Sequence, residues 1–204
     1  MLLVAFFIVG CGLCATEGTA LSVKPVSAST EKYTNMLKVL RMNCTLRLLM
    51  ISKEIENKTE ECLSSYFLEN TTDGARRTLQ TDIKFNKTAQ PNVIFSQSES
   101  EIRIAYKKEN SSVVVFVEKG DPIYNAWGKG RRVTYANEDC FILKAGKRNK
   151  EDDRMPCVLF GRENSRRCFA TFKTNCTSPK EVDLGKCETT DGNAINKEQD
   201  TCKR

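Results

Sequence analysis

The sequence predicts a mainly β protein: an eight-stranded antiparallel up-and-down barrel, with a short N-terminal helix and a C-terminal helix packed outside. The first observation behind this is that about eight segments with strand patterns follow one another at regular spacing. The second is that the links between them are short, which favours antiparallel order. Such strands close most economically into a barrel, because closure removes exposed edges. A β-sandwich is the alternative, but the sequence offers no place for its crossover connections.

Alternation of apolar and polar residues is the clearest strand signal. It is strongest in residues 78–85, where Leu79, Ile83 and Phe85 face one way, and in residues 101–107. Val113 to Glu118 is the strongest β-former in the chain. The other predicted strands are residues 45–55, 62–68, 93–96, 131–135, 140–145 and 157–160. Asp73-Gly74 is a hairpin turn signal between two of them.

Two segments have helical periodicity. Before the strands, Tyr33, Met36, Leu37 and Leu40 recur at helical spacing, and Ser29 or Thr30 is a candidate N-cap. After the strands, a helix is expected to carry Cys168, Phe169, Phe172 and Cys176, most of them on one face. We expect the first helix to cover one end of the domain and the second to be joined to the sheet by disulfides.

The chain of 204 residues suits a single domain with a leader. Residues 1–15 are apolar but shorter than the roughly 20 residues that a membrane span needs, so they indicate a secretory signal peptide. Cleavage is expected after Ala15, or as late as Ala20. We then expect a flexible segment and short helix over residues 16–42, the barrel and its outer helix over 43–187, and a polar tail over 188–204.

Sequons and cysteines agree with a secreted, extracellular protein. Six Asn-X-Ser/Thr sequons, at Asn43, Asn57, Asn70, Asn86, Asn110 and Asn175, predict a glycoprotein. Of ten cysteines, Cys11 and Cys14 leave with the signal peptide. The other eight predict four disulfides: Cys44, Cys62, Cys140, Cys157, Cys168, Cys176, Cys187 and Cys202. A zinc site is not expected, because the mature chain has no C-x-x-C pair and no histidine.

The absence of histidine also makes an enzyme improbable, because no Ser-His-Asp triad or Cys-His pair can form. No cofactor or metal is expected. The net charge is +6, but the basic clusters 129–132 and 147–150 fall in expected loops and lack interleaved aromatic residues. We therefore expect neither a nucleic-acid partner nor membrane insertion, and we expect a monomer.

The C-terminal half resembles the tick salivary lipocalins, which include the histamine-binding proteins. The resemblance lies in Tyr135-x4-Cys140-Phe-Ile-Leu, then Cys157-Val-Leu-Phe, then a helix of Phe172-x3-Cys176 type and a short strand ending in Cys187. It implies an eight-stranded barrel with an outer helix, and the disulfides Cys62–Cys187 and Cys140–Cys168. Cys157–Cys176 is the expected third pair and Cys44–Cys202 the fourth, with exchanged partners among Cys44, Cys168, Cys176 and Cys202 left open.

By this resemblance, the protein sequesters a small host mediator to suppress inflammation. The mediator is a biogenic amine, such as histamine or serotonin, or an eicosanoid or other lipid. Amine binders in the family show Cys-Asp and Glu-Leu motifs, but here Cys140 precedes Phe141, Asp139 lies one place early, and Val158-Leu-Phe160 has no glutamate. A buried ammonium group needs carboxylate or aromatic partners. A lipid needs only an apolar cavity with a few polar groups.

Candidate ligand contacts are Ile104, Tyr106, Phe116, Trp127 and Phe160, although core packing is favoured over ligand stacking for each of the aromatic ones. Strand alternation offers either Val115 and Val117 or Val114 and Phe116 as the inward pair, and it turns Arg103 outward. The alternative function is a filled barrel that acts on a host protein through its outer surface. The volume of the cavity discriminates the two, because a pocket of about 300 Å³ or more favours a carrier.

Overall fold

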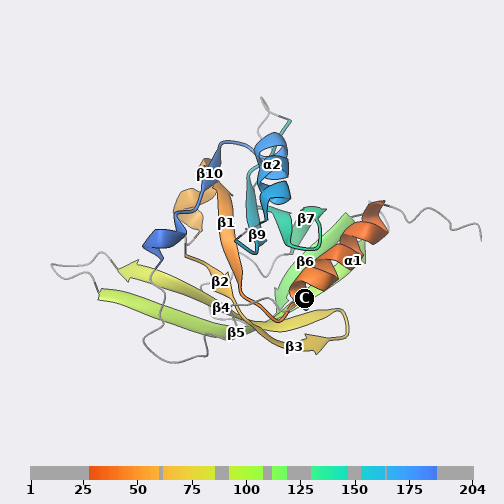
Figure 1. Cartoon of the computed structure of the whole chain (residues 1–204), viewed down its shortest axis with the longest axis horizontal. Coiled ribbons are helices and arrows are strands. Elements are labelled where there is room, and N and C mark those ends of the chain that lie inside the picture. The colour runs from red at the N-terminus through yellow and green to blue at the C-terminus, as the bar shows by residue number, and fades with distance from the viewer. Residues whose placement is uncertain are drawn as a thin grey trace, which may run out of the picture.

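A computed structural model describes residues 28–59, 62–85, 92–107, 112–118, 130–146, 153–163 and 165–187. Side chains 81–101, 106, 107, 118 and 166 are outside this description. The described part begins with helix α1 (Ala28–Leu40), continues with the strands, and ends with helix α2 (Arg166–Asn175), a short strand and a 3₁₀ helix (Leu184–Lys186). Figure 1 shows α1 in orange and α2 in blue beside the strands.

The strands form one closed antiparallel barrel. They are β1 (Leu46–Ser52), β2 (Ser64–Ser65), β3 (Phe67–Thr71), β4 (Gly74–Phe85), β5 (Asn92–Lys107), β6 (Ser112–Glu118), β7 (Arg131–Ala136), β8 (Cys140–Lys144), β9 (Cys157–Gly161) and β10 (Pro179–Glu181). Neighbouring strands pair in the order β1-β2-β4-β5-β6-β7-β8-β9, and pairing of β9 with β1 closes the ring. The predicted eight-stranded up-and-down barrel is therefore confirmed.

Two further strands lie beside the ring. β3 pairs with β4 through a tight hairpin in which Thr71 lies opposite Gly74, so the turn residues are Thr72 and Asp73, one place before the predicted Asp73-Gly74. Gly74 also lies against β5, where a Cβ atom would come within 1.8 Å of the Ile102 carbonyl oxygen, so only glycine fits. β10 pairs with the end of β1, beyond the two residues of β1 that pair with β2.

Three disulfides join the ends of this fold. Cys140 on β8 is bonded to Cys168 on α2, and Cys157 on β9 is bonded to Cys176 just after α2, with Cα–Cα distances of 6.4 and 5.7 Å. Cys62, just before β2, is bonded to Cys187 at a Cα–Cα distance of 5.3 Å. Cys62–Cys187 and Cys140–Cys168 are the two pairs that the resemblance implies, and Cys157–Cys176 is the third pair that we expected; all three are confirmed. Cys44 is also disulfide-bonded, whereas Cys202 lies outside the described residues, so Cys44–Cys202 stays a prediction.

Apolar residues form two clusters, one on each side of the barrel wall. The interior cluster joins Met36, Val39 and Leu40 of α1 to inward residues of nearly every strand, among them Leu48 and Ile104. The outer cluster holds Phe172 and Cys168 of α2 against the outside of β1, β8 and β9. Because successive residues on a strand face opposite sides, β8 and β9 supply both clusters, which explains why they are apolar throughout.

Several predicted boundaries were wrong. Residues 93–96 and 101–107 form one strand, β5, because β4 pairs with it without interruption from Gly74–Arg103 to Phe85–Asn92. Residues 62–68 are split between β2 and β3, and the first strand ends at Ser52, where a 3₁₀ helix (Lys53–Lys58) begins.

The short strand expected to end at Cys187 is β10, and Leu184–Lys186 is a 3₁₀ helix. α1 already begins at Ala28, before Ser29 and Thr30. Arg131 and Arg132 lie in β7, as the predicted strand 131–135 has them, so the basic cluster 129–132 is not wholly in a loop.

Four of the sequon asparagines lie in the described part. Asn43, Asn57, Asn70 and Asn175 are all exposed; Asn57 lies in the 3₁₀ helix Lys53–Lys58, Asn70 lies within β3 and Asn175 ends α2. Asn86 and Asn110 lie outside the described residues, as do Trp127 and residues 147–150. The expected signal peptide and polar tail also fall outside them.

Candidate functional site: an apolar cavity at the helix-covered end of the barrel

A cavity lies inside the barrel beneath the end of α1. Its wall is made by side chains from α1 and from seven strands or the residues just before them: Leu40, Leu46, Leu63, Ser65, Leu79, Ile102, Val115, Val117, Phe141, Leu143 and Phe160. Phe141 and Phe160 stack on each other, with ring centroids 5.7 Å apart. The space that the centre of a water molecule can occupy is about 50 Å³, and the wall presents no polar atom to it.

The C-terminal turn of α1 supplies the apolar cover of this cavity. Met36, Val39 and Leu40 are fully buried, and α1 lies against β4 to β8 (Figure 1). Asn35 Nδ2 donates a hydrogen bond to the carbonyl oxygen of Ala136 at 3.3 Å, and Arg41 reaches the carbonyl oxygens of Thr71 and Gly74. The hydrogen bonds of Asn35 and Arg41 are made to backbone groups at the ends of strands, and the apolar side chains of α1 face the barrel interior. Together these contacts fix α1 across the end of the barrel.

A buried arginine holds this end together. Arg77 of β4 is 0% exposed, and each of its guanidinium nitrogens has a partner. Nε donates to the Ser65 hydroxyl oxygen at 3.0 Å. The terminal nitrogens donate to four carbonyl oxygens, those of Leu40, Met42, Cys44 and Ser65, at 2.5 to 3.0 Å. The guanidinium carbon also lies 5.8 Å from the centre of the Phe67 ring.

These contacts explain why a cation is tolerated in the interior. The carbonyl groups of Leu40 and Met42 lie at and just after the C-terminal end of α1. Carbonyl groups in this position have no hydrogen-bond donor within the helix. Arg77 satisfies them and links α1 to β1, β2 and β4 in one place. Burial lowers the pKa of Arg77 to about 9, so the side chain still carries its proton at neutral pH.

Comparison with known proteins identifies the fold. No family model matches the sequence, and no curated protein matches it either. Lobster apocrustacyanin A1 aligns with a TM-score of 0.42 and 9% identity, over 76% of this chain and 82% of that chain. Japanin from Rhipicephalus appendiculatus, in a structure bound to cholesterol, aligns with a TM-score of 0.50 and 17% identity, over 71% of this chain and 94% of that chain. The fold is that of a lipocalin.

The lipocalin cavity includes some of the predicted ligand contacts. Phe160 lines it, and Ile104 belongs to the interior cluster beside it without touching the cavity. On β6 the inward pair is Val115 and Val117, so Phe116 lies on the other face, where its ring packs near Gly130. The side chain of Tyr106 and the whole of Trp127 lie outside the described residues.

Arg77 is the residue that the sequence analysis missed. Arg76 and Arg77 are adjacent on a strand, so their side chains must face opposite sides of the barrel wall. Arg76 pairs with Glu69 at 2.7 Å on the surface, which leaves Arg77 inside. A pair of adjacent arginines within a strand was therefore a signal that one cation is buried. Arg103 faces outward as expected, where it contacts Asp73 at 3.1 Å.

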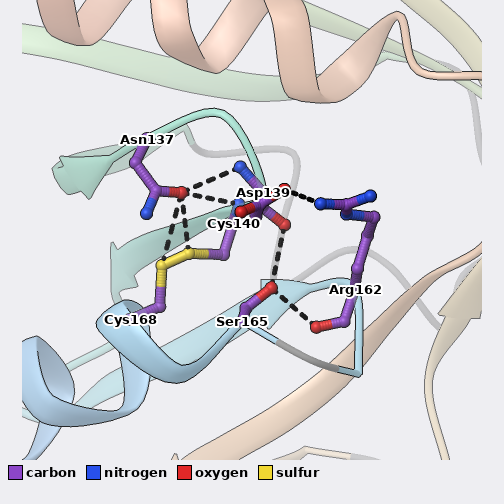
Figure 2. A network of polar contacts seen from close by, with 6 residues as sticks. All are labelled: Asn137, Asp139, Cys140, Arg162, Ser165 and Cys168. Atoms are coloured by element: carbon purple, nitrogen blue, oxygen red, sulfur yellow. Dashed lines mark hydrogen bonds and ion pairs between the residues drawn. A yellow bond between two sulfur atoms is a disulfide. The ribbon is translucent and has the colours of Figure 1, made fainter. Parts of the chain in front are cut away.

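The carboxylate nearest to the family's amine motif is not in the cavity. Asp139 lies in the turn between β7 and β8, where its carboxylate forms an ion pair with Arg162. Figure 2 shows the same turn fixed by Asn137, whose side-chain oxygen accepts hydrogen bonds from the backbone nitrogens of Asp139 and Cys140 at 2.9 and 3.0 Å. Ser165 donates to carbonyl oxygens of this network and begins α2. Asn137 therefore holds the turn beside Cys140, and the Asp139 carboxylate ties this turn to Arg162.

This position of Asp139 gives a testable consequence. We expect Asp139→Asn to leave ligand binding unchanged and to lower the free energy of unfolding by less than about 1 kcal/mol, because the ion pair with Arg162 is partly exposed. Chemical denaturation and ligand titration measure the two effects. A large loss of amine binding in Asp139→Asn would show that the carboxylate reaches a ligand after all.

The described part of the chain contains neither a candidate metal site nor a helix suited to cross a membrane. No group of three histidine, cysteine, aspartate or glutamate side chains there is arranged to hold a metal ion. Among the described helices, none has the length and apolar character to cross a membrane.

Proposed function

We propose that this lipocalin is a secreted, monomeric protein of tick salivary type that binds a small, uncharged, apolar host molecule in its barrel and thereby sequesters it. The observation that carries this proposal is the cavity inside the barrel, whose wall offers hydrocarbon and aromatic carbon and no charge. Three disulfides support export, because such crosslinks persist in oxidising compartments. The mechanism is stoichiometric, so affinity and secreted amount set its effect.

An apolar ligand suits this wall better than an amine does. An ammonium group moved from water into the cavity would lose its hydration and find no carboxylate among the lining residues. The stacked pair Phe141 and Phe160 would offer it ring faces at most. The same residues suit a sterol, an alkyl chain or an eicosanoid tail. Japanin, the similar structure, was bound to cholesterol, which supports a ligand of this class.

The small volume of the cavity favours a second candidate function. Its 50 Å³ is well below the roughly 300 Å³ at which ligand pockets begin. A lipocalin whose interior is filled by its own side chains would act on a host protein through its outer surface. The first proposal requires that a ligand extend beyond the described cavity, with only its apolar end beneath α1.

Native mass spectrometry of the secreted protein tests both candidates. The first predicts a one-to-one adduct that is released on unfolding and identified as a neutral, apolar molecule. Recovery of histamine or serotonin would overturn the proposed ligand class. Secreted protein without any adduct, which also fails to bind apolar molecules when they are added, would favour action through the surface.

A variant that fills the cavity provides a second test. Leu143 is 2% exposed and lines the cavity, so Leu143→Trp should block an apolar ligand, at a cost of about 1–3 kcal/mol in stability from overpacking. Leu68 is 40% exposed on β3, which makes Leu68→Trp a matched control for the same substitution. We expect titration with an apolar ligand to show lost binding in the first variant and unchanged binding in the second. Equal binding by both variants would place the ligand elsewhere.

A further inference from the structure

Two of the described sequons have a buried acceptor threonine. They are Asn43-Cys44-Thr45 and Asn175-Cys176-Thr177. The threonines are only 6% and 5% exposed, and neither hydroxyl has a hydrogen-bond partner among the described residues. Both asparagines are exposed, and both intervening cysteines are disulfide-bonded. In the folded protein the asparagine is therefore accessible, whereas the hydroxyl two residues later is not.

Packing does not explain these two threonines. Valine has nearly the same shape and would fill either site without burying an unpaired hydroxyl, which costs free energy. The described part of the chain has one other buried threonine hydroxyl without a partner, that of Thr71. Two of these three hydroxyls thus stand at the acceptor position of a sequon. A requirement that acts before folding accounts for threonine at positions 45 and 177.

N-glycosylation is such a requirement. The transfer joins the asparagine side-chain nitrogen to the anomeric carbon of an oligosaccharide carried on a lipid pyrophosphate. The new C–N bond forms as the C–O bond to the pyrophosphate breaks; the nitrogen loses a proton, and the lipid pyrophosphate leaves with the bonding electrons. The transferase recognises the asparagine together with the hydroxyl of the third sequon residue. A hydroxyl buried in the barrel is beyond its reach.

We propose that Asn43 and Asn175 are glycosylation sites that are open only before folding, and that closure of the disulfides of Cys44 and Cys176 ends their use. Asn57 and Asn70 form a second class, open in the folded protein as well. Thr72 is exposed and Thr59 is half-buried, so their hydroxyls lie near the surface. This proposal rests on the export proposed above and is independent of the ligand.

The test uses the full chain made without glycans, in its native oxidised state and after reduction with dithiothreitol. Both samples are incubated with purified oligosaccharyltransferase and lipid-linked oligosaccharide, and each site is mapped by mass spectrometry. We expect the native protein to gain glycans at Asn57 and Asn70 and none at Asn43 or Asn175, whereas the reduced chain gains them at all four. Modification of Asn43 or Asn175 in the native protein would overturn the proposal, as would a reduced chain that stays unmodified at both. Because no cell is involved, failure here is distinguishable from failure of export.

Valine variants test the packing argument separately. In the unglycosylated protein, Thr45→Val and Thr177→Val should leave the melting temperature unchanged or raised, because each removes a buried hydroxyl without a partner. In the reduced chain each variant should lose modification at its own sequon alone. Thr72→Val is the control at an exposed hydroxyl, expected to lose the glycan at Asn70 in both states. A lower melting temperature in both buried-site variants would contradict the idea that threonine is kept there for the sequon.

Discussion

Replacement of Arg77 by methionine is expected to destabilise the barrel by about 3–5 kcal/mol, because each buried carbonyl oxygen that loses its donor costs about 1–3 kcal/mol. Methionine fills much of the same volume but donates no hydrogen bond, so the carbonyl oxygens of Leu40, Met42, Cys44 and Ser65 lose their partner. Buried acceptors without partners carry the full desolvation penalty. The measurement is chemical denaturation of the purified protein, with the unfolding free energy extrapolated to water.

Arg76→Met is the matched control on the same strand. The side chain of Arg76 is 42% exposed and pairs with Glu69 on the surface, so this change should alter stability by less than about 1 kcal/mol. Arg77→Lys should also be strongly destabilising, because an ammonium group cannot make five directed contacts. If Arg77→Met were as stable as Arg76→Met, the network around Arg77 would not be what fixes α1 over the barrel end.

Loss of the Cys62–Cys187 disulfide is expected to cost about 5 kcal/mol. This bridge joins residues 125 positions apart, from the start of the barrel to the segment after α2. The entropy that a crosslink removes from the unfolded chain grows with the loop that it closes. The double variant Cys62→Ser, Cys187→Ser avoids a free thiol and is compared with the wild type by thermal and chemical denaturation.

The Cys157–Cys176 bridge provides the comparison. Its residues are 19 positions apart, so the corresponding double serine variant should lose about 3 kcal/mol, less than the loss for the longer loop. An equal or reversed order of the two losses would mean that contacts made in the folded state outweigh the loop entropy. It would also change how the role of the segment after α2 is understood.

The closed barrel was predictable because its signals are repetitive. Alternation in residues 78–85, the valines of β6 and the regular spacing of short strands all depend on one physical fact, that successive strand residues face opposite sides. Closure of β9 onto β1 followed from strand number and short connections. The family resemblance in cysteine spacing then gave two of the bridges, Cys62–Cys187 and Cys140–Cys168.

Local sequence patterns failed where a distant partner decided the structure. The polar stretch inside β5 looks like a turn, but β4 pairs with it residue by residue and supplies its backbone hydrogen bonds. The short strand was expected to end at Cys187, yet only Pro179–Glu181 finds an open edge, next to β1. Which strand lies beside a segment, and whether a free sheet edge is available to it, depends on the assembled sheet. A short stretch of sequence does not contain this information.

The candidate site was only partly predictable for a similar reason. Alternation placed Ile102 and Ile104 inside and Arg103 outside, but it left two choices of inward pair on β6. The direction of Phe116 depends on how β6 is registered against β5 and β7. Leu40 and Leu63, which complete the cavity wall, come from the end of α1 and from just before β2. Their positions depend on how the ends of the chain segments close the barrel, and this is set largely by Arg77.

The most direct test of the apolar cavity compares two ligands that share one alkyl chain. Purified protein, freed of bound lipid, is titrated with hexanol and with hexylammonium by calorimetry, with Leu143→Trp as the blocked control. The structure predicts that the neutral alcohol binds the wild type more tightly than the cation does, and that Leu143→Trp abolishes its binding. If hexylammonium binds at least as tightly as hexanol and is displaced by histamine, the interior recognises positive charge, and the assignment of an uncharged apolar ligand is wrong.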